Sequence, residues 1–62
     1  MTRKDYVLIA EVIKTQIELS LKFGEDDARY GAENIALDLA SKLSQDNPRF
    51  DRSRFLQACG VN

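Results

Sequence analysis

The sequence has no histidine, no tryptophan, one cysteine and one proline. A single cysteine excludes an internal disulfide, and without histidine it cannot build a zinc site, so we expect no metal and no cofactor. Its 62 residues allow one domain, 1–62. A folded chain of this size buries only about 60% of the surface that its unfolded chain exposes. Disulfides, metals or a second chain normally supply the missing stability, and with the first two excluded we expect an oligomer.

An excess of positive charge and a long apolar run are also missing. The net charge is −1 and the isoelectric point is near 5.2, which argues against nucleic acid as a partner. No segment approaches the roughly 18 apolar residues of a membrane span. Glu11 interrupts the apolar run 6–10 before any signal-peptide cleavage site. We expect no membrane segment and a reducing, cytoplasmic location, which suits a lone cysteine.

The apolar residues that are present predict an all-α fold. Two segments, about 3–23 and 27–44, repeat apolar residues at helical spacing and would pair as a hairpin. The first core stripe is predicted to contain Tyr6, Ile9, Ala10, Ile13, Ile17 and Leu21, and the second Ala28, Ala32, Ile35, Ala36, Leu39 and Leu43. Thr2 is the expected N-cap of the first helix, Gly24 its C-terminal glycine, and Asp26 or Asp27 the N-cap of the second. Gly31, inside the second helix, suggests a tight helix crossing.

A short third helix is predicted at about 52–59, against the open end of the hairpin. Pro48 ends the second helix, because the residue before a proline avoids helical backbone angles. Asp51 is the expected N-cap. Phe50 and Phe55 occupy the positions of a hydrophobic staple. Gly60 stands where a terminating glycine belongs.

The first helix carries more apolar surface than a hairpin needs. Leu8, Val12, Leu19 and Phe23 form a second stripe with spacings of 4, 7 and 4. Tyr30 and Leu37 lie off the core stripe of the second helix. A single wrapped core is one explanation, since helices carry broad apolar faces. Because monomers rarely expose large apolar patches, we favour these six residues as the interface of a two-fold symmetric homodimer through the first helix.

The sequence contains no motif typical of a catalytic site. There is no Gly-rich phosphate loop and no nucleophile beside a base. The acidic run 25–27 lacks the spaced ligands of a calcium loop, and reads as a helix start. Cys59 falls at a helix C-terminus, where the dipole disfavours a thiolate. We therefore predict no enzymatic activity and no catalytic residue.

Three arginines near the C-terminus have no comparable structural explanation. Arg49, Arg52 and Arg54 flank the two phenylalanines of the staple. They can form a solvated face with local pairs to Asp46 or Asp51. They can meet the acidic second helix at Glu33 and Asp38, within the chain or across a dimer. They can instead bind a phosphate or an acidic partner, because the guanidinium fork suits planar oxyanions.

Both ends of the chain resemble segments of known proteins. TRKDYVLIAEVI at 2–13 and NPRFDRSRFLQACG at 47–60 resemble the ends of a group of very small phage and prophage proteins. In that group a [TK]-x-x-D-Y-x-x-I-A start is joined by a variable middle to a D-N-P-R-F-D-x-x-R-F-L-x-A-C-G tail. The match covers about 26 of the 62 residues and leaves 14–46 unmatched. The resemblance implies a phage-encoded accessory protein of the bacterial cytoplasm, but it carries over no activity and no site residue.

These observations give one favoured function and two alternatives. We favour a non-catalytic protein that binds, and inhibits or redirects, a host defence or regulatory protein, because small phage proteins of this sort often act so. Arg49, Arg52 and Arg54 are its expected partner-binding residues, since arginine and aromatic side chains dominate binding energy. The alternatives are a small DNA-binding regulator that uses the basic tail, and a sponge for an anionic nucleotide signal in an arginine-lined dimer groove.

Overall fold

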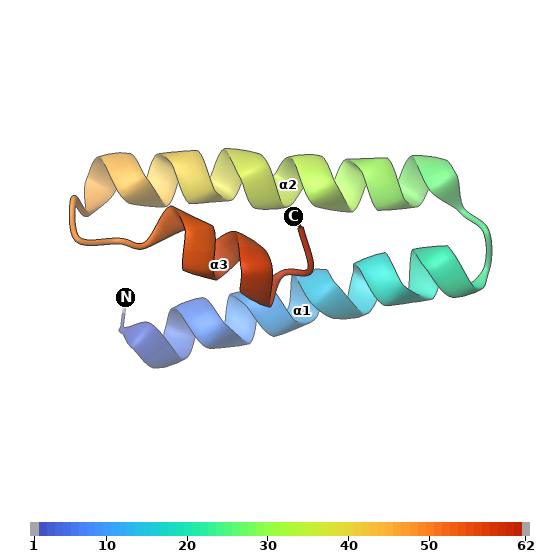
Figure 1. The fold of residues 1–62 in the computed structure, drawn as a ribbon, viewed down its shortest axis with the longest axis horizontal. Coiled ribbons are helices and arrows are strands. Elements are labelled where there is room, and N and C mark those ends of the chain that lie inside the picture. Colours follow the sequence, from blue (N-terminus) through green and yellow to red (C-terminus); the bar gives the residue numbers. More distant parts are fainter. Residues whose placement is uncertain (1, 62) are drawn as a thin grey trace.

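The computed structural model describes residues 2–61, which form three helices and no strand. They are α1 (Arg3–Lys22), α2 (Asp26–Asp46) and α3 (Arg52–Ala58). Helices α1 and α2 form an antiparallel hairpin, and α3 lies against its open end (Figure 1). The all-α prediction, with two long helices and a short third one, is confirmed. None of the three helices is long and apolar enough to cross a membrane.

Local signals set the start of α1. Thr2 is its N-cap, as predicted. The backbone N–H of Thr2 donates a hydrogen bond of 2.9 Å to the Asp5 carboxylate, which is the acidic half of a capping box. This bond lowers the pKa of Asp5 below its usual value. The carboxylate therefore stays ionised at the positive end of the helix dipole.

The turn between α1 and α2 is a Schellman motif. Gly24 has φ of +67°, a left-handed conformation that glycine adopts without strain. The N–H of Glu25 then donates to the carbonyl of Ser20 at 2.8 Å. Glu25 is also the N-cap of α2, although its side chain accepts no capping hydrogen bond, so the predicted cap at Asp26 or Asp27 is wrong. The motif turns the chain directly into α2, so that Glu25, which closes the first helix, is also the residue that begins the second.

The predicted signals around α3 are confirmed. Asp51 accepts a hydrogen bond of 3.0 Å from the backbone N–H of Arg54. The rings of Phe50 and Phe55 lie 5.4 Å apart, as a hydrophobic staple requires. Gly60 has φ of +82°, and the N–H of Val61 donates to the carbonyl of Leu56 at 2.9 Å. A second Schellman motif therefore ends α3 and carries Val61 into the core.

The core joins all three helices. Its buried side chains are Ala10, Ile13 and Ile17 of α1, Ala36 and Ala40 of α2, and Phe55, Cys59 and Val61 of the C-terminal segment. Ala36 and Ala40 are fully buried. Small side chains at these positions let α1 and α3 pack closely against α2.

Three residues break the predicted core stripes. Leu21 is 57% exposed and Ile35 is 61% exposed, although both were expected inside, and Ala28 is exposed as well. On α1 the inward positions alternate by 4 and 3 residues, as in paired helices that wrap around each other, and this carries Ser20 inward in place of Leu21. On α2 the inward stripe is centred on Ala36 and Ala40. Ile35, one residue before Ala36, is turned about 100° out of the interface.

Gly31 does not mark a tight crossing. A Cβ atom added there would meet nothing within 4 Å, so the helices do not approach at this glycine. The interpretation failed because close approach occurs at Ala36 and Ala40, which keep their helical propensity and still leave room for the neighbouring helix. Gly31 thus weakens α2 without a compensating contact.

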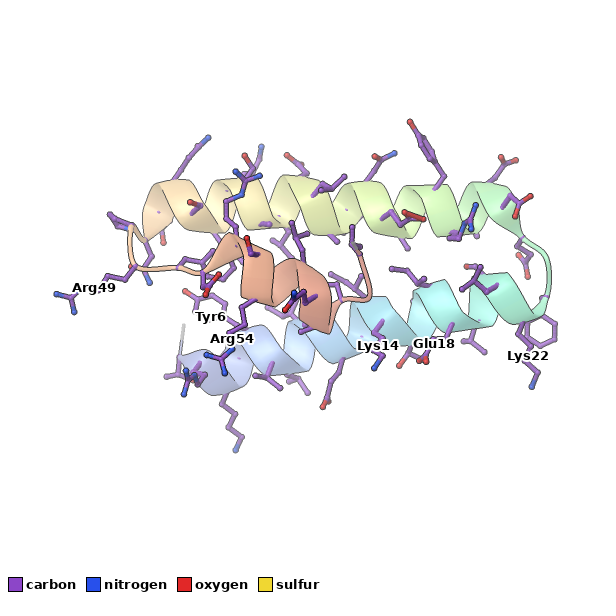
Figure 2. The ribbon with its side chains drawn as sticks, in the orientation of Figure 1. Tyr6, Lys14, Glu18, Lys22, Arg49 and Arg54 are labelled. Carbon is purple, nitrogen blue, oxygen red and sulfur yellow. The ribbon has the colours of Figure 1, made fainter. Side chains whose placement is uncertain are left out.

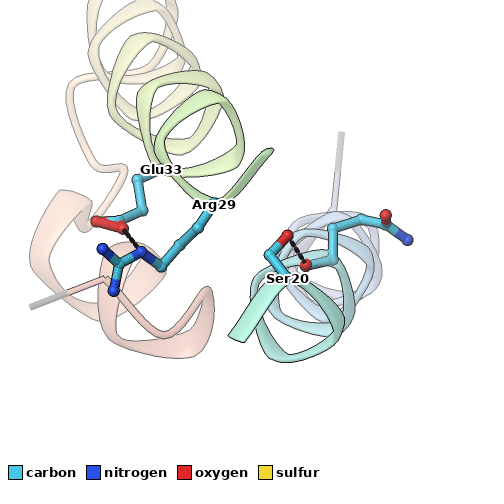
Figure 3. Close-up of polar contacts among 4 residues, drawn as sticks. Ser20, Arg29 and Glu33 are labelled. Atoms are coloured by element: carbon cyan, nitrogen blue, oxygen red, sulfur yellow. Dashed lines mark hydrogen bonds and ion pairs between the residues drawn. The ribbon is translucent and has the colours of Figure 1, made fainter. Parts of the chain in front are cut away.

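Helix α3 covers only half of the hairpin. A Cβ atom on Gly60 would contact Cγ of Lys14 at 3.7 Å, which places the end of this segment level with Lys14. Beyond Lys14 only α1 and α2 pack together (Figure 1). There the inward positions are partly polar (Figure 3). The buried Ser20 hydroxyl donates to the carbonyl of Gln16 at 2.7 Å, and Arg29 pairs with Glu33 at 3.6 Å.

Candidate binding groove

An open groove lies where α3 begins beside the first turns of α1. Its volume is about 540 Å³. The lining residues come from α1, the segment after α2, and α3: Arg3, Tyr6, Val7, Ala10, Asn47, Arg49, Phe50, Asp51, Arg54, Phe55 and Ala58. Distant parts of the sequence therefore meet here. We call this feature the arginine–aromatic groove.

Aromatic rings form one side of the groove. Tyr6 and Phe50 pack edge to face with ring centroids 4.9 Å apart, and Phe50 in turn packs against Phe55. Phe55 is buried, whereas Tyr6 and Phe50 are half-buried. The hydrophobic staple of α3 thus extends across to α1 through Tyr6. This contact fixes the position of α3 and at the same time presents two partly open rings to the groove.

Arginine side chains form the rim. Arg3, Arg49 and Arg54 line the groove, and all three residues are exposed. In Figure 2 the side chain of Arg49 extends away from the molecule, and that of Arg54 lies beside the start of α1. Asp51 contributes the one acidic group of the lining, and it accepts the capping bond of α3. The groove therefore combines an apolar wall with a positively charged edge.

The structure separates the three arginines predicted to bind a partner. Arg49 and Arg54 share the groove, while Arg52 lies on α3 outside its lining. Arg3 was missed, because nothing in the local sequence near residue 3 reveals that α3 packs beside it. Its place in the groove follows only from the packing of the third helix on the first.

The ion pairs considered for these arginines are not formed within residues 2–61. Glu33 pairs with Arg29, and Asp38 pairs with Lys42 at 3.2 Å, so both acidic residues of α2 are matched on their own helix. Neither Asp46 nor Asp51 lies within ion-pair distance of a tail arginine in this part of the chain. The guanidinium groups at the groove thus keep their donors available for a ligand.

The groove contains no arrangement typical of a catalytic centre. Among residues 2–61 no three histidine, cysteine, aspartate or glutamate side chains are grouped to hold a metal ion. Cys59 is fully buried outside the groove, and burial raises the pKa of its thiol. A thiol with a raised pKa is a poor nucleophile at neutral pH. The groove offers charged groups, hydrogen-bond donors and apolar surface.

The residues predicted to form an oligomer interface occupy two different sides of the hairpin. All six are exposed: Leu8, Val12, Leu19, Phe23, Tyr30 and Leu37. At about 100° per residue, the three on α1 and Phe23 directly after it lie opposite the side that faces α3. The side chain of Glu33 points toward the side of the hairpin where α3 lies (Figure 3). Tyr30 and Leu37 lie on the same face of α2 as Glu33. The six therefore cannot form one continuous face.

A different exposed apolar residue of α2 lies on the side of the α1 stripe. Ile35 is about 200° around α2 from Glu33, on the same side of the hairpin as the exposed stripe of α1. We call Leu8, Val12, Leu19, Phe23 and Ile35 together the back face. Ile35 escaped the prediction because its hydrophobicity and spacing assigned it to the core.

Comparisons of the chain with known protein families, with curated protein sequences and with solved structures find no match.

Proposed function

We propose that this chain is a non-catalytic binding protein that holds an acidic segment of a partner protein in the arginine–aromatic groove. The observation that carries the proposal is the pairing of Arg49 and Arg54 with the partly open rings of Tyr6 and Phe50. Guanidinium forks bind carboxylates through two parallel hydrogen bonds. Aromatic and arginine side chains are also the commonest hot spots of protein interfaces.

The sequence resemblance suggests the identity of the partner. If the chain is a phage accessory protein, the partner is a protein of the bacterial host, and binding inhibits or redirects it. A defence or regulatory protein fits this role best, because a small phage protein gains most by blocking such a target. The proposal needs no catalytic group, in keeping with a groove that offers recognition chemistry.

The geometry favours a protein ligand over DNA. Residues 25–46, which contain α2, carry a net charge of −4, the wrong sign for a helix that enters the major groove. Helix α3 holds two of the arginines but has only seven residues and is packed against the hairpin. A nucleotide remains the competing ligand, because arginines and aromatic rings also bind phosphates and bases.

The test uses capture from bacterial lysate followed by binding with purified components. The groove variant is Arg49→Glu with Arg54→Glu. The control is Arg52→Glu, which changes the same type of side chain outside the groove and makes half the change in net charge. Both exchanges leave the backbone capping bonds of these residues in place. We expect the purified partner to bind the groove variant at least tenfold more weakly, a loss of about 1.4 kcal/mol, and the control nearly normally.

Other results would contradict the proposal in distinct ways. If the control loses half or more of the binding free energy that the groove variant loses, general positive charge, and not the groove, drives binding. Capture that disappears after nuclease treatment and falls steeply with salt would favour the nucleic-acid alternative. Binding of a free nucleotide that depends on Arg49 and Arg54 would favour the nucleotide sponge.

A further inference from the structure

We infer that a second copy of this chain covers the back face, with the two α1 helices antiparallel and the two-fold axis passing between Thr15 and Gln16. The five side chains of this face are 43% to 64% exposed, although each is large and apolar. Single exposed apolar residues need no explanation, but an aligned stripe that runs the length of a helix does. The inference concerns the side of the hairpin opposite the groove and does not depend on the proposed function.

The spacing of the stripe matches itself when it is reversed. Leu8 and Phe23 are equally distant from the midpoint between Thr15 and Gln16, and so are Val12 and Leu19. In an antiparallel pair with its axis at that midpoint, Leu8 therefore lies opposite Phe23 of the second copy, and Val12 opposite Leu19. A two-fold interface requires such self-complementarity: if one residue contacts a second residue of the other copy, then the second residue also contacts the first across the axis. A parallel arrangement would instead place like against like along the whole stripe.

The centre of the stripe supplies a polar contact that can set this register. The hydroxyl of Thr15 already donates to the carbonyl of Glu11 at 2.9 Å. Gln16 is exposed beside the axis, and its side-chain amide both donates and accepts, so two copies of it can pair with each other. One polar residue within an apolar helix seam is a known means of fixing register.

The charges at the two ends of the hairpin are complementary in the same arrangement. The open end begins with Arg3 and Lys4, and the turn end carries the acidic run 25–27. An antiparallel pair brings the basic start of α1 in each copy next to the acidic run of the other. A parallel pair would stack the acidic runs of the two copies. Electrostatics thus favours the same orientation as the apolar spacing.

The size of the chain supports a second copy as the occupant. A standard interface takes about 800 Å² from each partner. This chain exposes 4742 Å², so such an interface would cover about a sixth of its surface. Helix α1, with 20 residues, is about 30 Å long, and side chains beside it such as Ile35 widen the face beyond this one helix.

Sedimentation over a range of concentrations tests the assembly. We expect the wild type to be a dimer, and Leu19→Glu to raise the dimer dissociation constant at least about 100-fold, because the symmetry places two buried carboxylates in one interface. Leu21→Glu is the matched control: Leu21 is similarly exposed but belongs to the side of α1 away from the back face, so this variant should remain dimeric. A wild type that stays monomeric at high concentration, or equal effects of both variants, would overturn the inference.

Cross-linking tests the orientation without relying on a destabilising charge. Leu8→Cys and Phe23→Cys are prepared separately, mixed and oxidised; the natural Cys59 is buried and does not compete. The antiparallel register predicts a disulfide between the two different variants in the mixture, and little self-linked dimer in either variant alone. Efficient self-linking of each variant would overturn the register, since it indicates parallel helices.

Discussion

The two ends of the hairpin are stabilised in different ways. At the open end three helices enclose a core that includes Ala10, Ala36 and Phe55, and the aromatic chain from Tyr6 through Phe50 to Phe55 ties α1 to α3. At the turn end only two helices meet. There the inward positions include Ser20 and Arg29, while large apolar side chains point to solvent.

The difference shows how a 62-residue chain distributes a limited core. At the open end α3 covers the inward side chains of α1 and α2. With seven residues, however, it is too short to reach the turn. The turn end therefore depends on backbone signals within the chain, and on burial by a second copy if the proposed dimer forms. The groove lies at the open end, where all three helices pack together, and this packing gives the proposed binding side chains a rigid support.

Removing the aromatic side chain at the centre of the open end should have the largest effect. Phe55 is 4% exposed, and changing a buried phenylalanine to alanine costs about 3–5 kcal/mol. A core of this size rarely supplies more than about 3–5 kcal/mol in total, so Phe55→Ala should be largely unfolded at 25 °C. Urea denaturation followed by circular dichroism measures the change.

The control for this comparison lies at the turn end. Leu21→Ala removes a similar apolar side chain from an exposed position and should change the free energy of unfolding by no more than about 0.5 kcal/mol. Similar losses in the two variants would mean that the turn end is packed as firmly as the open end.

Changing either of two glycines to alanine should alter the free energy of unfolding by an intermediate amount, in opposite directions. Gly24→Ala forces a side chain into the left-handed conformation of the turn and should cost about 1–2 kcal/mol. Gly31→Ala adds a methyl group in open space inside α2 and should stabilise the protein by about 0.5–1 kcal/mol. Denaturation midpoints of both variants measure the pair. Destabilisation by Gly31→Ala would show that the helices approach at this residue after all.

The smallest expected effect is the pH dependence of the cap of α1. The pKa of Asp5 is lower in the folded state than in the unfolded chain. The contribution of Asp5 to the free energy of unfolding is therefore complete above the unfolded pKa of about 3.9, and it declines as the pH falls through the folded pKa. The melting temperature of the wild type should exceed that of Asp5→Asn at neutral pH, and the difference should disappear in acid. A difference that persists after Asp5 is protonated would mean that charge is not its source.

Local signals made much of the fold predictable. The stop at Pro48, the cap at Asp51 and the left-handed glycines Gly24 and Gly60 act over a few residues, so the sequence reveals them directly. The predictions that placed Leu21 and Ile35 in the core failed because the hydrophobicity of a residue does not show how its helix is rotated about its own axis. For the groove, Arg49 and Arg54 were identifiable as surplus charge, whereas Arg3 needed the packing of α3.

The sequence by itself determined the three helices, most of their ends and the surplus of apolar surface, because each depends on residues within a few positions of one another. Only the tertiary structure decided which apolar side chains are enclosed and which arginines meet. Those outcomes depend on the rotation of each helix about its own axis. Contacts between residues far apart in the chain, such as Tyr6 with Phe50, set that rotation.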